Sequence, residues 1–374
     1  MREVKVKDKI YTYQAIFLIT INRMMVPLTY APLIKSEYAN QDTWFIILLS
    51  IPYTIMISFP LLYLSRRFYG KNLLEFTEII MGKYIGRILA IIYGIVFLFF
   101  LIFLTGTFIE ILESALYPNT PTWVNLSIVT VTTLYIVNKG SINIARLSEV
   151  VFPIILFIFF MLLLLGLENY DFDVFLPILK DSNFKQLNLG AIFNSLVHMD
   201  ILILAMLASN LEKKKDVNKV FTYSVLFSSI ITVLSTVVVQ STLGIAYTKH
   251  ANFPFYTYAR LIKIGDTMGF DLLYVISWII GSILRLCVYF HTCTVVFGKV
   301  FNTRNQRTYI PIIIVMTIIV LYIKGRRTIV TKIVLPQVFI ITVTIISIII
   351  IPAIVLITYF FRRNSLQKSG MLKR

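Results

Sequence analysis

Ten long apolar stretches decide what this chain can fold into. A helix needs about 20 apolar residues to cross the roughly 30 Å hydrocarbon core of a bilayer, and the stretches are of about that length. They lie near residues 10–34, 43–64, 88–115, 122–138, 146–167, 188–211, 219–247, 271–297, 308–323 and 330–361. Only 14% of the 374 residues are charged, whereas a soluble domain carries about a quarter. These features exclude a soluble enzyme and predict an all-α integral membrane protein, surrounded by lipid, with about ten transmembrane helices.

The basic residues predict how these helices are oriented. With the N-terminus inside, 23 of the 35 Lys and Arg residues fall in inner segments and 10 in outer loops, while Arg23 and Arg285 lie within spans. Cytoplasmic loops are enriched in Lys and Arg, so both termini are predicted to be cytoplasmic. Only the loop at 324–327 (KGRR) contradicts this orientation. The net charge of +17 forms no continuous face, so no nucleic-acid partner is expected.

The chain is predicted to form one domain. No linker, low-complexity tract or soluble domain is visible, and we assign residues 1–361 to a single ten-helix transmembrane domain and residues 362–374 to a short cytoplasmic tail. Two loops carry apolar residues at helical spacing. Residues 71–87 are predicted to lie as a helix in the inner interface and residues 253–266 as a helix on the outer side.

The first span contains two prolines. Pro27 removes a backbone donor in the middle of the span, and Pro32 does so near its outer end. Backbone groups freed by a break in a helix cannot face lipid, so a break at Pro27 would line a cavity enclosed by protein. A simple proline kink is the alternative.

Three charged residues are predicted near the middle of the bilayer. At a rise of 1.5 Å per residue, Arg23, Asp200 and Arg285 lie roughly 18 to 21 Å from the starts of spans one, six and eight. Two guanidinium groups and one carboxylate leave a net positive charge, and an unpaired buried charge is costly. A bound carboxylate would neutralise it. The alternatives are that Asp200 is a hydrogen-bonded structural residue and that Arg285 pairs with Asp200.

The position of these residues in the chain suggests a ligand site. In transporters built from inverted repeats, the first helix of each half is broken and its ends bind the substrate at the midplane. Spans one and six hold those positions if five spans pair with five, so we predict an inverted 5+5 repeat with broken helices one and six. The candidate ligand-binding residues are Asn22, Arg23, Met25, Val26, Ser195, His198, Asp200 and Arg285.

Motifs of catalysis and cofactor binding are not found. The sequence has no H-E-x-x-H, no phosphate-binding glycine loop, no paired metal ligands and no G-x-S-x-G. We therefore expect no enzymatic activity, no metal and no cofactor. The two cysteines, Cys287 and Cys293, share one apolar run and are expected to be packing residues.

Three segments resemble a known family of membrane proteins. They are residues 71–94 (KNLLEFTEIIMGKYIGRILAIIYG), 253–266 (FPFYTYARLIKIGD) and 274–290 (YVISWIIGSILRLCVYF). They are similar to the spore germination permease-like family, the B subunits of nutrient germinant receptors, within the amino acid–polyamine–organocation superfamily. The family's outer-loop motif opens with Phe-Pro, reaches an Arg and precedes a span with a Trp and a basic residue. The matching positions here are Phe253, Pro254, Arg260, Trp278 and Arg285.

The chain departs from the family pattern at two places near the predicted site. Met25-Val26-Pro27 stands where the superfamily usually has Gly-x-Gly, which argues against direct approach of a ligand to bare backbone. Met199-Asp200 stands where the family commonly has a small residue followed by Glu, so the acidic group is one methylene shorter.

The resemblance implies a LeuT-like bundle in the inner membrane of a bacterial spore. The chain would act with an A-type subunit and a lipoprotein C-type subunit and would sense a small nutrient such as an amino acid. A secondary amino-acid transporter of the same fold is one alternative, and a structural subunit with a vestigial site is another. Arg285 favours the sensor, because an arginine at that depth takes the place of a coupling cation and cannot release a proton.

The outer amphipathic segment is predicted to act as a lid. Its aromatic side chains could close over a ligand at the midplane, and Pro254 and Gly265 would set its ends. Packing against partner proteins is the alternative. The predicted lid residues are Phe253, Phe255, Tyr256 and Tyr258.

Overall fold

The fold is a bundle of helices. The computed structural model describes residues 9–180, 182–213, 216–263, 270–303, 309–323 and 337–368. Within these ranges no strand is assigned, only an isolated bridge between Ile10 and Leu211. The α-helices are α1 (Thr12–Thr29), α2 (Thr43–Arg67), α3 (Leu73–Met81), α4 (Lys83–Ile111), α5 (Thr122–Val137), α6 (Ser141–Leu165), α7 (Phe184–Leu196), α8 (Asp200–Leu207), α9 (Asp216–Leu243), α10 (Ile245–His250), α11 (Pro254–Leu261), α12 (Asp271–Val300), α13 (Ile310–Ile323), α14 (Gln337–Thr344) and α15 (Ile351–Lys368).

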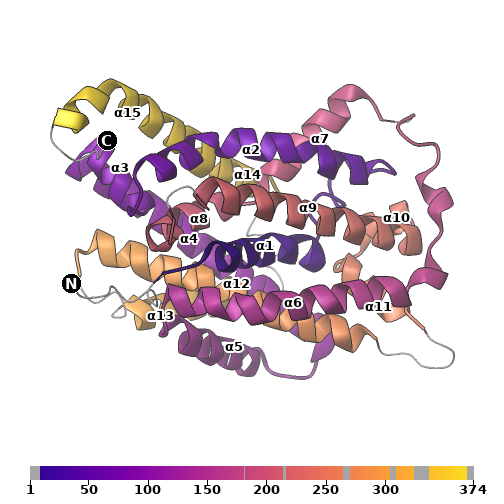
Figure 1. Ribbon diagram of the computed structural model, residues 1–374. Helices are drawn as coiled ribbons and strands as arrows, with labels where there is room; N and C mark the ends of the chain where they lie inside the picture. Colours follow the sequence, from indigo (N-terminus) through magenta and orange to yellow (C-terminus); the bar gives the residue numbers. More distant parts are fainter. Residues whose placement is uncertain are drawn as a thin grey trace.

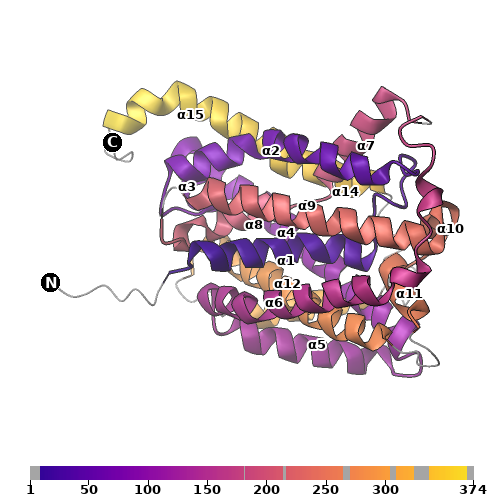
Figure 2. The ribbon, with the colours of Figure 1, turned by 45° about the vertical axis from the view of Figure 1, so that its right-hand side comes forward.

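Helix α1 lies at the centre of the bundle. It packs against α6, α8, α9 and α12, while α2 packs on α7 and α9 and α12 on α4, α5 and α6. The long helices run side by side, and α1 begins and α15 ends at the same end of the bundle (Figure 1). We call this the N-terminal end. Helices α10 and α11 lie at the opposite end in both views (Figures 1 and 2).

The prediction of an all-helical membrane protein is confirmed. All ten predicted spans contain a helix in their described parts, although residues 324–336 lie outside the described residues, and with them the KGRR loop. The described segments long and apolar enough to cross a membrane are Thr43–Arg67, Lys83–Leu116, Ser141–Leu165, Phe184–Asn210, Asp216–Leu243, Asp271–Val300 and Phe339–Gln367. Helix α5 is a shorter apolar helix, and α1 and α13 occupy the two remaining predicted spans.

The predicted break in helix six is present. Helix α7 ends at Leu196 and α8 begins at Asp200, so residues 197–199 interrupt the span. A carboxylate is favourable at the start of a helix, where the backbone N–H groups are unpaired and the dipole is positive. Asp200, at the first position of α8, is placed to stabilise this second start of a helix within the membrane.

Helix one differs from its prediction. Helix α1 continues through Pro27 and ends at Thr29, so the prediction of a break at Pro27 is wrong. The ring of Pro27 removes a donor only two residues before the end of the helix, where little of the backbone ladder remains to be lost. The chain leaves the helix as the N–H groups of Tyr30 and Ala31 both donate to the Val26 carbonyl, at 3.1 and 3.2 Å. The rest of the predicted span lies in turns.

The predicted interfacial helix at 71–87 is divided in two. Helix α3 starts with a capping box, in which the Glu75 N–H donates to Asn72 Oδ1 at 3.0 Å and the Asn72 N–H donates back to Glu75 Oε2 at 3.2 Å. It ends at Gly82, whose φ of +88° suits only a residue without a side chain. Tyr84, within the predicted interfacial helix, belongs to α4 and is 85% exposed. The apolar periodicity of the sequence continues through Gly82 and therefore did not predict the turn between α3 and α4.

The first residues of the predicted tail continue α15. Arg362 Nη1 donates to the Ile80 carbonyl at 2.5 Å, and Leu366 is buried. Helix α15 therefore extends to Lys368 and is attached to α3 at the N-terminal end of the bundle.

Candidate functional site

An ion pair joins α1 to the break in helix six. Arg23 Nη1 lies 3.3 Å from Asp200 Oδ2, and the two residues are only 4% and 2% exposed. Arg23 Nε also donates to Ser228 Oγ of α9 at 2.8 Å. The predicted carboxylate therefore has a partner, and α1, α8 and α9 meet at it.

His198 lies inside the break beside this pair. Its Nδ1 is 3.8 Å from Asp200 Oδ2, which is too long for a hydrogen bond. Nδ1 is buried and has no hydrogen-bond partner among the described residues. A buried ring nitrogen without a partner is unfavourable, so this atom is available to a ligand that can satisfy it.

Arg285 of α12 is the third charged residue of the cluster. Its guanidinium lies within reach of the hydroxyls of Tyr30 and Tyr289, while its Nε has no hydrogen-bond partner in the described part of the chain. No ion pair there joins Arg285 to Asp200, whose partner is Arg23. The alternative in which Arg285 pairs with Asp200 is thus not what the structure shows. With one carboxylate for two guanidinium groups, the cluster retains a net positive charge.

Two hydrogen bonds hold α12 against the last turn of α1. The Tyr274 hydroxyl donates to the Leu28 carbonyl at 2.6 Å, and Trp278 Nε1 donates to Thr29 Oγ1 at 3.0 Å. The Trp278 ring also stacks on Phe108 of α4. These contacts fix the separation between α1 and α12 on the side of the cluster nearer to α11.

The remaining predicted site residues fall into two groups. Asn22, Met25 and Val26 lie on α1 near the cluster: Asn22 Oδ1 is buried without a partner in the described residues, and Met25 Sδ accepts from Ser282 Oγ at 3.8 Å. Ser195 instead faces α2, where its hydroxyl lies 3.1 Å from the Ser50 carbonyl. These contacts thus join Arg23 and His198 to Asp200 and Met25 to the helix of Arg285, whereas Ser195 lies apart from them.

The cluster is closed. A cavity of about 10 Å³ is lined by Val26 and His198 among others, and one of about 20 Å³ by Tyr30 and Arg285. Each has room for about one water molecule. A ligand of amino-acid size would therefore have to separate the helices before it could reach these groups.

Helix α11 covers the opposite end of the bundle from the N-terminus. The Tyr258 hydroxyl donates to the Leu162 carbonyl of α6 at 2.8 Å and lies 2.7 Å from the Tyr170 hydroxyl. The Tyr256 hydroxyl donates to the Ala115 carbonyl at 3.1 Å. Burial raises the pKa of the Tyr258 phenol, so this group remains a hydrogen-bond donor at neutral pH.

The aromatic rings of α11 complete its attachment. Phe255 stacks on Phe159 of α6 with ring centroids 5.7 Å apart and also meets Tyr274 of α12. Phe255, Tyr256 and Tyr258 are buried, and Phe253 is half-buried. The predicted lid residues are thus packed against the bundle, while Gly265 and Asp266 lie outside the described residues.

Sequence reasoning missed three contributors to the cluster. Tyr289 follows Arg285 by four residues, a spacing that places both on one face of α12 and could have identified it. Tyr30 and Ser228 come from other helices, and no local pattern points to them. His291, six residues after Arg285 on α12, lines a separate cavity nearer the N-terminal end.

The cluster has the chemistry of a binding site for an anion or a zwitterion. Two guanidinium groups supply fixed positive charge, the unpartnered Asn22 Oδ1 is an acceptor, and the unpartnered His198 Nδ1 is an acceptor in the neutral tautomer that carries its proton on Nε2. Among the described residues, no group of three His, Cys, Asp or Glu side chains could hold a metal ion.

The chain belongs to the spore germination protein family, whose sequence model matches residues 9–329. Spore germination protein B2 of Bacillus subtilis (strain 168) is 22% identical over 310 residues, which cover 81% of this chain and 82% of that protein. Spore germination protein KB of the same organism is 21% identical over 273 residues, 71% of this chain and 73% of KB. Spore germination protein YndE, also from that organism, is 29% identical over 176 residues, and the match spans 48% of its length.

Solved structures of transporters share the fold. The nucleobase-cation-symport-1 family transporter Mhp1, in a closed conformation with bromovinylhydantoin bound, matches with a TM-score of 0.69 at 10% identity over 95% of this chain and 79% of that chain. A manganese transporter of Eremococcus coleocola matches with a TM-score of 0.61 at 11% identity over 92% and 76%. The predicted LeuT-like fold is therefore confirmed.

Proposed function

We propose that this protein is the nutrient-sensing subunit of a spore germinant receptor and that it binds an amino acid between α1, the α7–α8 break and α12. The observation that carries the proposal is the charge imbalance at the centre of the bundle. Asp200 forms an ion pair with Arg23, whereas Arg285 has no carboxylate partner among the described residues. A ligand carboxylate would neutralise Arg285 in a site where an uncompensated charge is costly.

The unpartnered acceptors favour a zwitterion over a simple anion. The carboxylate would bind Arg285 and the neighbouring Tyr30 hydroxyl, and the ammonium group would donate to Asn22 Oδ1 and His198 Nδ1. Met25 and Val26 would contact the ligand's side chain. Asn22 Oδ1 and His198 Nδ1, which are now buried without a partner, would each gain one, a free-energy advantage that only the bound state has.

Binding would be coupled to opening of the bundle. The cluster is closed, so the ligand must favour a state in which α1 and α12 are further apart. A ligand shifts a conformational equilibrium only by binding one state more tightly than the other. Helix α11, attached to α6 and α12 by Phe255 and Tyr258, would be the lid that moves with this change.

The family also supports a cellular setting. Spore germination proteins KB and B2 are relatives over most of the chain, and the chain would act with A-type and C-type receptor subunits in the inner membrane of a bacterial spore. Residues 1–361 would form the transmembrane domain and 362–374 a cytoplasmic tail. Since α1 begins and α15 ends at the same end of the bundle (Figure 1), both termini would be cytoplasmic.

A secondary amino-acid transporter is the competing function. It is supported by the fold, which this chain shares with the transporters named above. The position of Arg285 argues against it, because a permanent cation in the cluster leaves no evident place for a coupling ion and cannot carry a proton.

The test is binding by the full chain in lipid nanodiscs, with radiolabelled amino acids as probes. Arg285→Gln and Asp200→Asn should each weaken binding of the amino acid that binds the parent protein. Arg363→Gln is the matched control, because Arg363 is exposed on the last helix. If folded Arg285→Gln and Asp200→Asn proteins bound as tightly as the parent, the site would lie elsewhere.

A second measurement separates sensor from transporter. The protein in liposomes should bind its amino acid without accumulating it when a sodium or proton gradient is applied. Gradient-driven accumulation, with normal germination of spores that lack the gene, would establish the transporter instead.

A further inference from the structure

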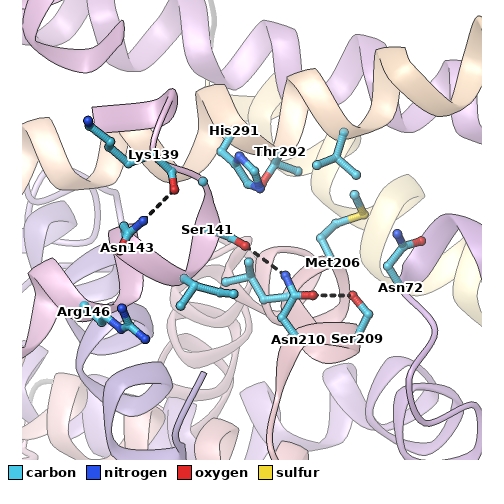
Figure 3. A pocket seen from close by; sticks show the side chains of 14 residues that line it. Asn72, Lys139, Ser141, Asn143, Arg146, Met206, Ser209, Asn210, His291 and Thr292 are labelled. Carbon is cyan, nitrogen blue, oxygen red and sulfur yellow. Dashed lines mark hydrogen bonds between the residues drawn. The ribbon is translucent and has the colours of Figure 1, made fainter. Parts of the chain in front are cut away.

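A separate polar cavity of about 500 Å³ opens between α6, α8 and α12 near the N-terminal end of the bundle (Figure 3). This volume is within the range of about 300 to 1,000 Å³ that small-molecule sites occupy. The cavity lies further along α8 and α12 than the central cluster, toward the N-terminal end of the bundle. His291 follows Arg285 by six residues and Met206 follows Asp200 by six, which is about 9 Å in each case.

The lining of this cavity is basic. Lys139 and Arg146 contribute positive charge, and none of the described side chains that line the cavity is acidic. Both lie on the same side of the cavity in Figure 3, and His291 projects from α12 on another side. A cavity with this net positive lining favours anions over cations.

The start of α6 adds backbone donors to the same wall. Helix α6 begins at Ser141, after Gly140, and its first turn has neither a side-chain cap nor an acidic residue. The first N–H groups of a helix have no partner within the helix, and with the helix dipole they form a favourable place for a phosphate group. Ser141, Ile142 and Asn143 of this turn all line the cavity.

Contacts that do not involve the first backbone N–H groups of α6 hold the walls of the cavity in place. Asn210 Nδ2 donates to Ser141 Oγ at 2.9 Å, and the Asn210 carbonyl accepts from the Ile10 N–H at 2.8 Å. The segment before α1, the end of α8 and the start of α6 are therefore tied together at one residue. The site needs no large rearrangement to receive a ligand, in contrast to the central cluster.

We propose that this cavity binds a phosphate-type oxyanion, either on a soluble phosphorylated molecule or on the headgroup of an anionic lipid. Lys139, Arg146 and the first amides of α6 bind the oxyanion, and Asn143 and His291 contact the rest of the ligand. This site is independent of the amino-acid site proposed above, because it shares no residue with it.

Two variants test the site in the full chain. Lys139→Gln removes one charge; Lys139 Nζ lies 5.1 Å from the centroid of the Tyr135 ring. Lys219→Gln is the matched control, because Lys219 is also exposed and its Nζ lies 5.9 Å from the Tyr223 ring, again at a spacing of four residues. Asn143→Asp places a carboxylate in the cavity, yet it adds an acidic residue to the first turn of α6, which favours the helix. Asn143 Nδ2 also donates to the Lys139 carbonyl at 2.7 Å, so Asn143→Ala, which loses this hydrogen bond without adding a charge, is the control for Asn143→Asp and should still respond to phosphate.

The first measurement is the thermal unfolding midpoint of the detergent-purified protein during titration with inorganic phosphate, at ionic strength held constant with chloride. Phosphate should raise the midpoint of the parent and of Lys219→Gln with the same saturation. Lys139→Gln should need about tenfold more phosphate, as expected for loss of one charge-assisted hydrogen bond, and Asn143→Asp should not respond.

A second arm uses nanodiscs of phosphatidylglycerol or phosphatidylcholine. If phosphate has no effect in detergent but phosphatidylglycerol stabilises the parent over Asn143→Asp, the oxyanion is a lipid headgroup. If phosphate acts in detergent, the source is soluble. The proposal is overturned if neither arm distinguishes Asn143→Asp from the parent, or if Lys139→Gln and Lys219→Gln respond alike. Arg285→Gln should keep the phosphate response, which separates this site from the central one.

Discussion

The hydroxyl oxygens of Tyr170 and Tyr258 lie 2.7 Å apart, although 88 residues separate them in the chain. Each also lies close to a carbonyl at the end of α6: the Tyr170 hydroxyl oxygen is 2.7 Å from the Leu163 carbonyl oxygen, and the Tyr258 hydroxyl oxygen is 2.8 Å from the Leu162 carbonyl oxygen. The pair therefore fastens α11 and the loop after α6 to the same turn of helix.

The first prediction concerns this attachment. Tyr258→Phe should lower the free energy of unfolding by about 1 to 3 kcal/mol, because the Leu162 carbonyl and the Tyr170 hydroxyl lose a buried partner. Denaturation of the purified protein measures the loss, and hydrogen exchange should show faster opening of α11. Tyr247→Phe serves as control, since Tyr247 is 57% exposed. Equal effects of the two changes would show that the tyrosine pair does not hold the helix.

The second prediction uses the glycine next to that pair. A Cβ atom at Gly166 would overlap the Tyr258 hydroxyl and come within 3.0 Å of the Tyr170 hydroxyl. Gly166→Ala should therefore destabilise the protein by about 1 to 3 kcal/mol through overpacking. Combined with Tyr258→Phe, which removes the overlapping oxygen, the loss should be smaller than the sum of the single changes. Strict additivity in the double mutant would contradict the packing seen here.

The third prediction concerns the Arg23–Asp200 pair. Asp200→Asn should destabilise the protein by about 3 to 5 kcal/mol, because it leaves Arg23 buried without a carboxylate. The double change Arg23→Gln with Asp200→Asn should recover part of that loss. Thermal unfolding of the four proteins completes the cycle, with Asp173→Asn as a control at an exposed carboxylate. A double mutant less stable than Asp200→Asn alone would mean that the pair's charges do not stabilise each other.

The fourth prediction concerns the two ends of the bundle. Cysteines placed at Asn364, on the last helix, and at Asn119, in the loop between α4 and α5, are exposed. The positive-inside rule places the first inside the cell and the second outside. An impermeant thiol reagent should label the cysteine at 119 in intact cells and the one at 364 only after lysis. Cys287 and Cys293 are buried and should give little background. The reverse labelling pattern would invert the assigned orientation.

Hydrophobic length in the sequence was sufficient to predict the helices. The break before Asp200 could also be predicted, because span six holds the position of a broken helix when five spans pair with five, and the charge of Asp200 near the middle of the bilayer is costly without a partner. Turns that depend on a single dihedral angle were not predictable, and Gly82 is the example: the apolar periodicity continues through it while the backbone does not.

The charge balance of the candidate site was predictable, but its pairing was not. Depth along the spans placed Arg23, Asp200 and Arg285 at one level. Which arginine meets the carboxylate depends on how α1 and α12 are rotated, and that follows from long-range contacts such as Trp278 with Thr29. For the same reason, Ser195 was assigned to the site although it faces α2.

The hydrogen bonds from Tyr274 and Trp278 to the last turn of α1 also affect the ligand concentration at which the protein responds. If opening between α1 and α12 precedes binding, the apparent dissociation constant equals the intrinsic one divided by the fraction of open molecules. Because these two side chains stabilise the closed state, they then set the fraction of open molecules and so the ligand concentration needed for a response, although neither contacts the ligand. Related chains that share every contact residue could respond at different concentrations simply because this fastening is weaker or stronger.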